Sequence, residues 1–386
     1  MSRHSSLLIP DAVQWRSEPG YSSAAAVAIQ QAYSSVKPPL RGTTAYLLAY
    51  ALVSPFMTSR VSLRQRLIIV YILAMAHTAT GDHLRAIGCL DEALELSLRL
   101  KDIDAPIELF YLRGSLYRTH SRFVPAVSDF MACLELLQGT ISEQNDPADL
   151  TFMAHVLVDK ALAHFFLAQY AQVEACLKPA LSILADSASD QMTVANMLWT
   201  YALLERQRGH LEPALNHAKQ TCQLYAQLGS PLSLVRIQIL CGNIALDLAE
   251  TYPSSSNMAD RYMRFAQSYS ERSTMTKTLQ DPSGEGLAML LDARFGRVAR
   301  TPAVDSLKVI AATIHKASEL GDSALLCQAY SELGDEQTAR GELLGARNSF
   351  RKALDVAHTY KFPALAAPAQ RFFEMSASLD SLGSPG

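Results

Sequence analysis

Apolar residues recur along the chain at the spacing of amphipathic helices. From Val70 to Ala93 the sequence reads V-x-x-L-A-x-x-H-x-x-x-G-x-x-x-x-A-x-x-x-L-x-x-A. Apolar positions three and four residues apart share one face of an α-helix. Gly81 interrupts the pattern at its centre, and glycine is the residue that most easily adopts the positive φ found where a helix ends. The segment therefore predicts two helices joined by a tight turn.

The same order of residue types returns at several places further along the chain. Counted from a first repeat that begins near residue 67, clear copies begin near residues 107, 154, 195 and 327, and a weaker copy near residue 235 contains Cys241 and Gly242. Successive starts are about 40 to 47 residues apart, longer than the 34 residues of a standard two-helix repeat. The last interval is about twice as long as the others, so the segment 284–320 is predicted to hold a degenerate copy. Self-similarity at such a period indicates stacked helical hairpins.

Residue size within the copies has a packing reason. Small residues in the first helix (Gly114, Ala202 and Gly334) allow the second helix of the same hairpin to approach closely. Small residues in the second helix do the same from the other side, and large apolar residues then fill the space between hairpins. The small residues are Ala86, Ala126, Ala214 and Ala346, and the large ones are Leu90, Phe130, Leu177 and Phe350.

This small–small–large order resembles the tetratricopeptide repeat family, in a long-period form similar to the sensor regions of some bacterial regulators. The resemblance implies an all-α fold, a right-handed α-α superhelix of about seven helical hairpins with capping helices at both ends. The predicted organisation is a flexible N-terminus at 1–20, an atypical helical pair at 21–60, repeats at 61–360, and a capping helix with a tail at 361–386. Residues 278–286 are predicted to form a long linker.

In the tetratricopeptide family the first helices of the hairpins line a concave groove, so the resemblance also implies which side chains contact a partner. Aromatic, amide and arginine side chains are common anchors of protein interfaces. The candidate partner-binding residues are Tyr71, Tyr111, Arg118, His155, Phe165, Phe166, Trp199, Arg206, Gln207, Arg236 and Asn243. For Phe165, Phe166 and Trp199, an ordinary place in the core between repeats is an equal alternative. Arg206 and Arg236 favour the interface, because burying an unpaired charge is costly.

Composition narrows the functional classes. The net charge is −3 with a pI near 6.4, and charged residues make up only 18% of the chain. Such a chain offers no strong positive field, so we expect no direct nucleic-acid partner. The six cysteines form no CxxC pair and are predicted to be buried, reduced thiols of a cytoplasmic protein, or a nuclear one in a eukaryote. The uncharged stretch Thr43–Ser59 is short for a membrane span, so no membrane partner is expected.

The sequence contains no P-loop, HExxH or GxSxG motif, so neither an enzyme, a cofactor nor a metal site is predicted. The sequence favours a non-enzymatic scaffold that binds a peptide or a helical segment of a protein partner in the concave groove. The alternative is a regulatory sensor domain that binds a signalling peptide or a small ligand. An enclosed aromatic pocket near Phe165, Phe166 and Trp199 would favour the sensor, and an open polar channel would favour the scaffold.

Overall fold

The computed structural model describes residues 62–102, 104–144, 147–186, 190–253, 255–273, 275–279, 281–300 and 305–382. Within these ranges every regular element is a helix, and no strand occurs. The all-α, tetratricopeptide-like fold class is therefore confirmed for this part of the chain. The predicted flexible N-terminus and the helical pair at 21–60 lie outside the described residues.

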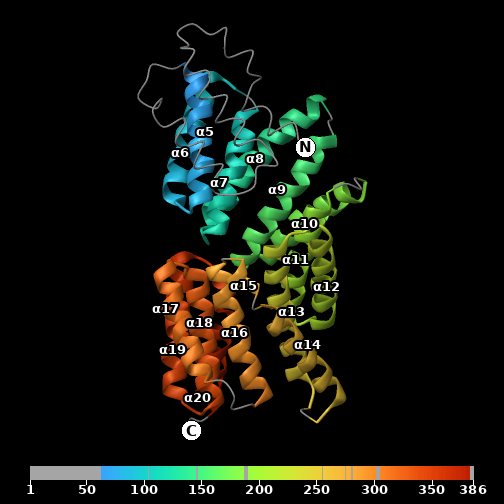
Figure 1. The fold of residues 1–386 in the computed structure, drawn as a ribbon, viewed down its shortest axis with the longest axis vertical. Helices are drawn as coiled ribbons and strands as arrows, with labels where there is room; N and C mark the ends of the chain where they lie inside the picture. Colours follow the sequence, from blue (N-terminus) through green and yellow to red (C-terminus); the bar gives the residue numbers. More distant parts are fainter. Residues whose placement is uncertain are drawn as a thin grey trace. The chain divides into compact units, whose positions relative to one another are not determined.

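The described helices follow one another as hairpins (Figure 1). They are α5 (Leu63–Thr80), α6 (His83–Leu100), α7 (Ala105–Thr119), α8 (Phe123–Gln144), α9 (Pro147–Phe166), α10 (Tyr170–Asp186), α11 (Gln191–Gln207), α12 (Leu211–Gln227), α13 (Pro231–Thr251), α14 (Asn257–Ser273), α15 (Met275–Thr278), α16 (Pro282–Ala299), α17 (Ser306–Leu320), α18 (Ser323–Ala339), α19 (Leu343–Tyr360) and α20 (Ala367–Leu382), with a 3-10 turn at Pro363–Ala366 before α20. We call α5, α7, α9, α11, α13, α16 and α18 the first helices, and the helix that completes each hairpin its second helix. The described part thus holds seven hairpins.

The chain divides into two compact units. Unit 1 comprises the described residues of Met1–Thr119 and Pro125–Leu157, and unit 2 comprises those of His120–Val124 and Val158–Gly386. Within unit 1, α6 packs against both α5 and α7. Within unit 2, α12 packs between α11 and α13, and α17 packs between α16 and α18. The repeat pattern did not predict this division.

Local sequence explains where the helices begin and end. Ser62 and Gln65 form a reciprocal capping box at the start of α5, which satisfies two amides that the helix leaves unpaired. The three predicted turn glycines, Gly81, Gly209 and Gly341, have φ values of 79°, 81° and 78°. Residues with a Cβ adopt this conformation at a cost, so the turn prediction is confirmed.

The predicted role of the small residues is also confirmed. A Cβ added to Gly114 would lie 2.9 Å from the Phe130 ring, and one added to Gly334 would lie 2.6 Å from the Phe350 ring. Both distances are shorter than van der Waals contact, so only glycine allows these rings to pack there. Ala126 and Ala346 of the second helices are completely buried.

The degenerate repeat exists, but the predicted linker before it is shorter than expected. Helices α16 and α17 form the predicted hairpin, yet α16 already begins at Pro282, so most of the predicted linker at 278–286 is helical. The reason is a strong start signal: the Asp281 carboxylate accepts a hydrogen bond from the Gly284 amide at 3.0 Å, and Pro282 occupies the first helical position, where proline is favoured.

Helix α13 is the one described helix whose length and apolar composition would suit a membrane span. In the structure it packs against α12, α14 and α16. Most of its apolar side chains, including Ile237, Ile244 and Leu248, are buried in these contacts. The same composition is what a central core helix of a helical stack requires.

Candidate binding surface

Polar side chains on consecutive first helices of unit 2 pair with each other. The Arg206 guanidinium of α11 reaches the Asp247 carboxylate of α13 through two bonds, Nε to Oδ2 at 2.5 Å and Nη2 to Oδ1 at 3.3 Å. Such two-point contacts fix the orientation of both groups. The spacing of 41 residues is about one repeat, so the pair joins equivalent positions on neighbouring hairpins.

The next first helix continues this pairing. The Arg294 guanidinium of α16 donates to Asp247 at 2.6 Å and to Glu250 at 2.7 Å. Only 9% of the Arg294 side chain is exposed, against 46% for Glu250. Burial alone would raise the pKa of Asp247, but the Arg206 and Arg294 guanidiniums outweigh it and hold that pKa well below its usual value.

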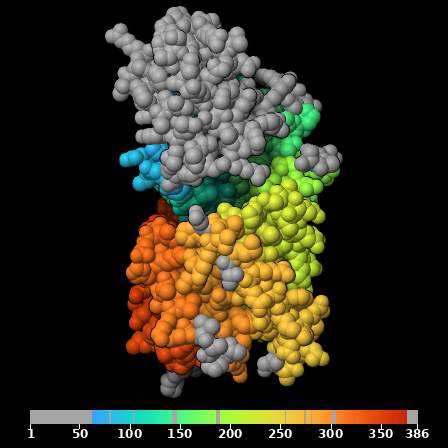
Figure 2. Space-filling view, in the orientation of Figure 1, coloured from blue at the N-terminus to red at the C-terminus, as the bar shows by residue number. Residues whose placement is uncertain are grey.

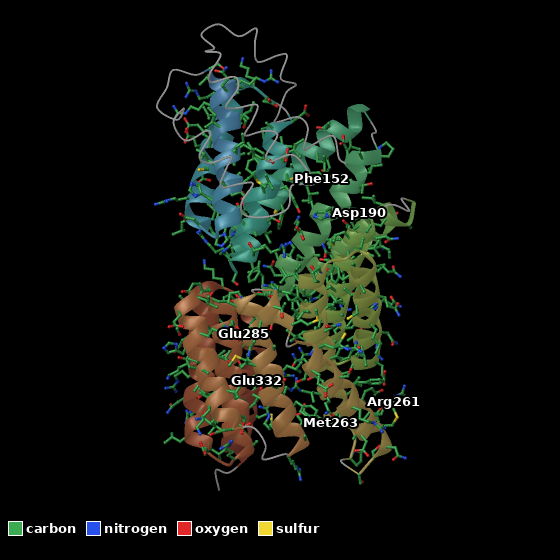
Figure 3. The ribbon with its side chains drawn as sticks, in the orientation of Figure 1. Phe152, Asp190, Arg261, Met263, Glu285 and Glu332 are labelled. Atoms are coloured by element: carbon green, nitrogen blue, oxygen red, sulfur yellow. The ribbon has the colours of Figure 1, made fainter. Side chains whose placement is uncertain are left out.

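The pairing ends on α18. The Arg297 guanidinium lies 2.9 Å from Glu332, labelled in Figure 3, and 3.9 Å from Glu336. Glu336 also accepts hydrogen bonds from Ser306 at 2.6 Å and from Arg340 at 2.8 Å. In Figure 2 the orange atoms of α16 and α17 and the gold atoms of α14 lie at the surface of unit 2.

We call this set of side chains the charged ladder, and it carries more acid than base. Its members are Arg206, Arg294, Arg297, Asp247, Glu250, Glu332, Asp335 and Glu336, with Arg340 at its edge. Four guanidiniums therefore face five carboxylates. The excess of carboxylates affects Asp335. Burial and the neighbouring Glu332 charge raise the pKa of Asp335 to about 6.

The other candidate residues of unit 2 contact groups outside the ladder or at its edge. Arg236 of α13 forms a two-point pair with the buried Asp281, at 2.9 and 2.8 Å. Asn243 donates from its amide to the Ile239 carbonyl at 3.2 Å and accepts from Arg294 at 3.5 Å. Gln207 is exposed at the end of α11. The arginines and Asn243 thus contact groups of this chain, and their predicted role in partner binding stays a prediction.

Two tyrosines among the candidate residues of unit 1 form hydrogen bonds through their hydroxyls instead. The Tyr71 hydroxyl donates to Glu108 at 3.0 Å, and the Tyr111 hydroxyl lies 2.6 Å from His155 Nε2. Phe152, labelled in Figure 3, packs edge-on against Tyr111 with ring centres 5.2 Å apart. Burial of Glu108 raises its pKa to about 7. Arg118 is half-buried near the end of α7.

The aromatic candidates form two groups, Phe165 with Phe166 and Trp199 by itself. Phe165 is buried and meets Phe166 edge-on at 5.5 Å, and Phe166 stacks on Phe123 at 4.5 Å. Trp199 is half-buried and packs with Tyr225 at 6.1 Å, in the core cluster of α11–α14. The alternative of an ordinary core position therefore describes the contacts of Phe165 and Trp199.

Sequence reasoning missed most of the ladder. Asp247, Arg294, Arg297 and Glu332 were not among the candidates, although Asp247 stands at a groove position of its repeat. Opposite charges one repeat apart, such as Arg206 and Asp247, are a signal that could have found part of it. Arg294 and Arg297 lie in the degenerate repeat, where the weak pattern gives no register.

Comparison with known proteins finds the fold but no family. No family model matches the chain, and no curated protein matches its sequence. Solved structures do match. The apo form of the quorum sensor NprR from B. thuringiensis has a TM-score of 0.62 at 12% identity, over 89% of this chain and 91% of that one.

Two further similar structures are Rap proteins. Aspartyl phosphate phosphatase F from Bacillus subtilis has a TM-score of 0.58 at 14% identity, over 86% of this chain and 79% of that one. A Rap protein in complex with competence and sporulation factor has a TM-score of 0.55 at 14% identity, over 93% of this chain and 99% of that one. The similarity is one of fold. At such low identity it assigns no activity to this chain.

Proposed function

We propose that this chain is a non-enzymatic binding protein that holds a peptide, or a helical segment of a protein partner, on the first helices of unit 2. The observation that carries the proposal is the charged ladder, which extends over four first helices, α11, α13, α16 and α18. We place the protein in the cytoplasm, where its six cysteines would stay reduced.

The ladder is a poor device for stability alone. Removing paired charges from water costs about as much as their attraction returns, and well-packed apolar residues often serve a core better. The partly exposed members, such as Arg206 and Glu250, still have donors and acceptors to offer to a ligand. A peptide presents amides, carbonyls and charged ends along its length, and these match a row of alternating guanidinium and carboxylate groups.

The similar structures support binding rather than a particular ligand. One is a Rap protein in complex with competence and sporulation factor. Another is the Rap conjugation gene regulator of plasmid pLS20 in complex with the Phr* peptide, with a TM-score of 0.56 at 11% identity over 86% of this chain and 96% of that one. Both hold a partner on the same fold. The Bacillus subtilis protein is named a phosphatase. We propose only a binding role for this chain.

A second candidate is a sensor of a free signalling peptide. It is favoured by the two complexes above and by the description of NprR as a quorum sensor. The two candidates differ in what occupies the ladder: a short free peptide for the sensor, and a segment of a larger protein for the scaffold. A sensor should bind a short free peptide as tightly as the same sequence fused to a carrier protein, whereas a scaffold should prefer the fused segment.

The test is selection of a displayed random-peptide library on the purified full chain, followed by titration of the enriched peptides as free and carrier-fused forms. Fluorescence anisotropy gives their affinity. We expect enriched peptides whose affinity falls about tenfold, or 1.4 kcal/mol, in Glu250→Gln and in Glu332→Gln. The matched control is Arg351→Ala, an exposed position on second helix α19.

Circular dichroism establishes that each variant keeps the helical content of the wild type. No enrichment above the carrier alone would contradict the proposal. So would peptides that bind the two ladder variants and the wild type equally well, because they would then contact another surface.

A further inference from the structure

Two free thiols lie next to each other in the core of unit 2. Cys222 of α12 and Cys241 of α13 have their sulfur atoms 3.7 Å apart, and both are reduced in the structure. A disulfide bond is about 2.0 Å long, so the sulfurs would have to approach by about 1.7 Å. Rotation of the two side chains would have to supply most of this movement.

The two sulfurs differ in access and in charge. Cys222 is half-buried, whereas Cys241 is fully buried behind it. The contact with the Cys241 thiol lowers the pKa of Cys222, burial opposes this shift, and the Arg272 guanidinium adds to it. The hydrogen bond to Cys222 and burial raise the pKa of Cys241. The accessible thiol is thus also the more acidic one, which is the property of an attacking cysteine.

The other four cysteines lack this combination. Burial raises the pKa of Cys89 to about 11, and those of Cys133 and Cys327 to about 12. It also raises the pKa of Cys176. All six cysteines lie in the described part of the chain, and within it only the Cys222–Cys241 contact brings two sulfur atoms within hydrogen-bond range.

We propose that Cys222 and Cys241 form a dithiol modification site that a hydroperoxide oxidises to a disulfide. The Cys222 thiolate attacks one oxygen of the hydroperoxide, so that a sulfur–oxygen bond forms, the oxygen–oxygen bond breaks, and an alcohol (or water, from hydrogen peroxide) leaves. Cys241 then gives up its proton and attacks the Cys222 sulfur. The hydroxyl group leaves as water. Two thiols and one hydroperoxide thus yield one disulfide, one alcohol and one water.

The position of the pair links this chemistry to the charged ladder. Cys241 and Asp247 lie on the same helix, α13, and α12 belongs to the hairpin that carries Arg206. A bond between α12 and α13 would fix one hairpin against the next, and it would fix the distance that the Arg206–Asp247 pair spans. Reversible oxidation therefore gives unit 2 a covalent control that does not depend on which ligand the ladder binds.

Mass spectrometry of the full chain tests this directly. Trypsin cleaves after Lys219, Arg236 and Arg261, so Cys222 and Cys241 fall in separate peptides, 220–236 and 237–261. After treatment with one molar equivalent of hydrogen peroxide and alkylation of the remaining thiols, we expect these two peptides to be joined, with the loss of two hydrogen atoms. Four of the six thiols should remain for alkylation, and dithiothreitol should restore all six.

Matched variants separate this site from general oxidation. Cys176→Ser should leave the joined peptides unchanged, whereas Cys222→Ser should abolish them and leave Cys241 reduced. Arg272→Gln should slow the reaction without preventing it, because the guanidinium only favours the thiolate of Cys222.

The proposal fails if wild-type protein, shown to be folded by circular dichroism, yields no joined peptides. It also fails if Cys222 proceeds to sulfinic acid, or if Cys89 or Cys176 is oxidised first. These results concern the wild-type chain, so they decide the question even if a variant folds poorly.

Discussion

The two units bridge neighbouring first helices with different kinds of contact. In unit 1, tyrosine hydroxyls bridge neighbouring first helices through hydrogen bonds, Tyr71 to Glu108 and Tyr111 to His155. In unit 2, arginines bridge neighbouring first helices through ion pairs, Arg206 to Asp247 and Arg297 to Glu332. The hairpin packing is alike in both, with Gly114 against Phe130 and Gly334 against Phe350. The two units therefore share the packing of their hairpins and differ in the side chains that join neighbouring first helices.

The largest expected effect comes from breaking the ladder at its most buried cation. Arg294→Met leaves Glu250 without its partner and Asp247 with one guanidinium instead of two. Loss of one partner of a buried ion pair costs about 3 kcal/mol, measured as the free energy of unfolding in urea by circular dichroism. Arg351→Met, at an exposed position, should change stability by less than about 0.5 kcal/mol. Equal effects of the two variants would mean that the ladder is not an electrostatic unit.

In unit 1 the corresponding test is the pH dependence of the free energy of unfolding. Because burial raises the pKa of Glu108 from 4.5 to about 7, the unfolded chain loses this proton first. Stability should therefore fall as pH rises between about 4.5 and about 7, by about 3 kcal/mol for a shift of this size. Glu108→Gln should remove this part of the pH dependence in urea titrations, whereas Glu135→Gln, at an exposed position of α8, should retain it. Identical pH profiles for all three proteins would contradict the burial argument.

A third experiment examines the close packing within hairpins that both units share. Ala126→Leu in unit 1 and Ala346→Leu in unit 2 insert bulk at completely buried positions, and overpacking of this kind costs about 1 to 3 kcal/mol. Thermal and urea unfolding should show losses of similar size in both. Ala311→Leu, on the exposed face of α17, should be nearly neutral. If one of the two buried sites tolerates leucine, the hairpins of the two units do not pack alike.

The smallest expected effect concerns the single hydrogen bond between Tyr111 and His155. Tyr111→Phe removes the hydroxyl that contacts His155 and keeps the ring that packs on Phe152, so we expect a loss of about 1 kcal/mol. Tyr360→Phe, whose ring is half exposed, serves as the control. A loss as large as that of Arg294→Met would remove the distinction between the two units.

The sequence predicted those features that depend on one hairpin at a time. The turns at Gly81, Gly209 and Gly341 and the close approach at Gly114 follow from local spacing, and the structure confirms them. The ladder could not be predicted in full, because its pairs form only after hairpins stack. Arg294 and Arg297 also lie in the degenerate repeat, whose register the pattern did not fix. The division into two units has no counterpart in the repeat pattern, since that pattern runs through both.

Hydrogen–deuterium exchange, with a peptide enriched on the full chain in the selection described above, shows whether the ladder is where the peptide binds. We expect slower exchange on peptide binding in α11, α13, α16 and α18, the helices that carry the ladder, and unchanged exchange in second helices α17 and α19. Protection confined to the second helices or to unit 1 would contradict it.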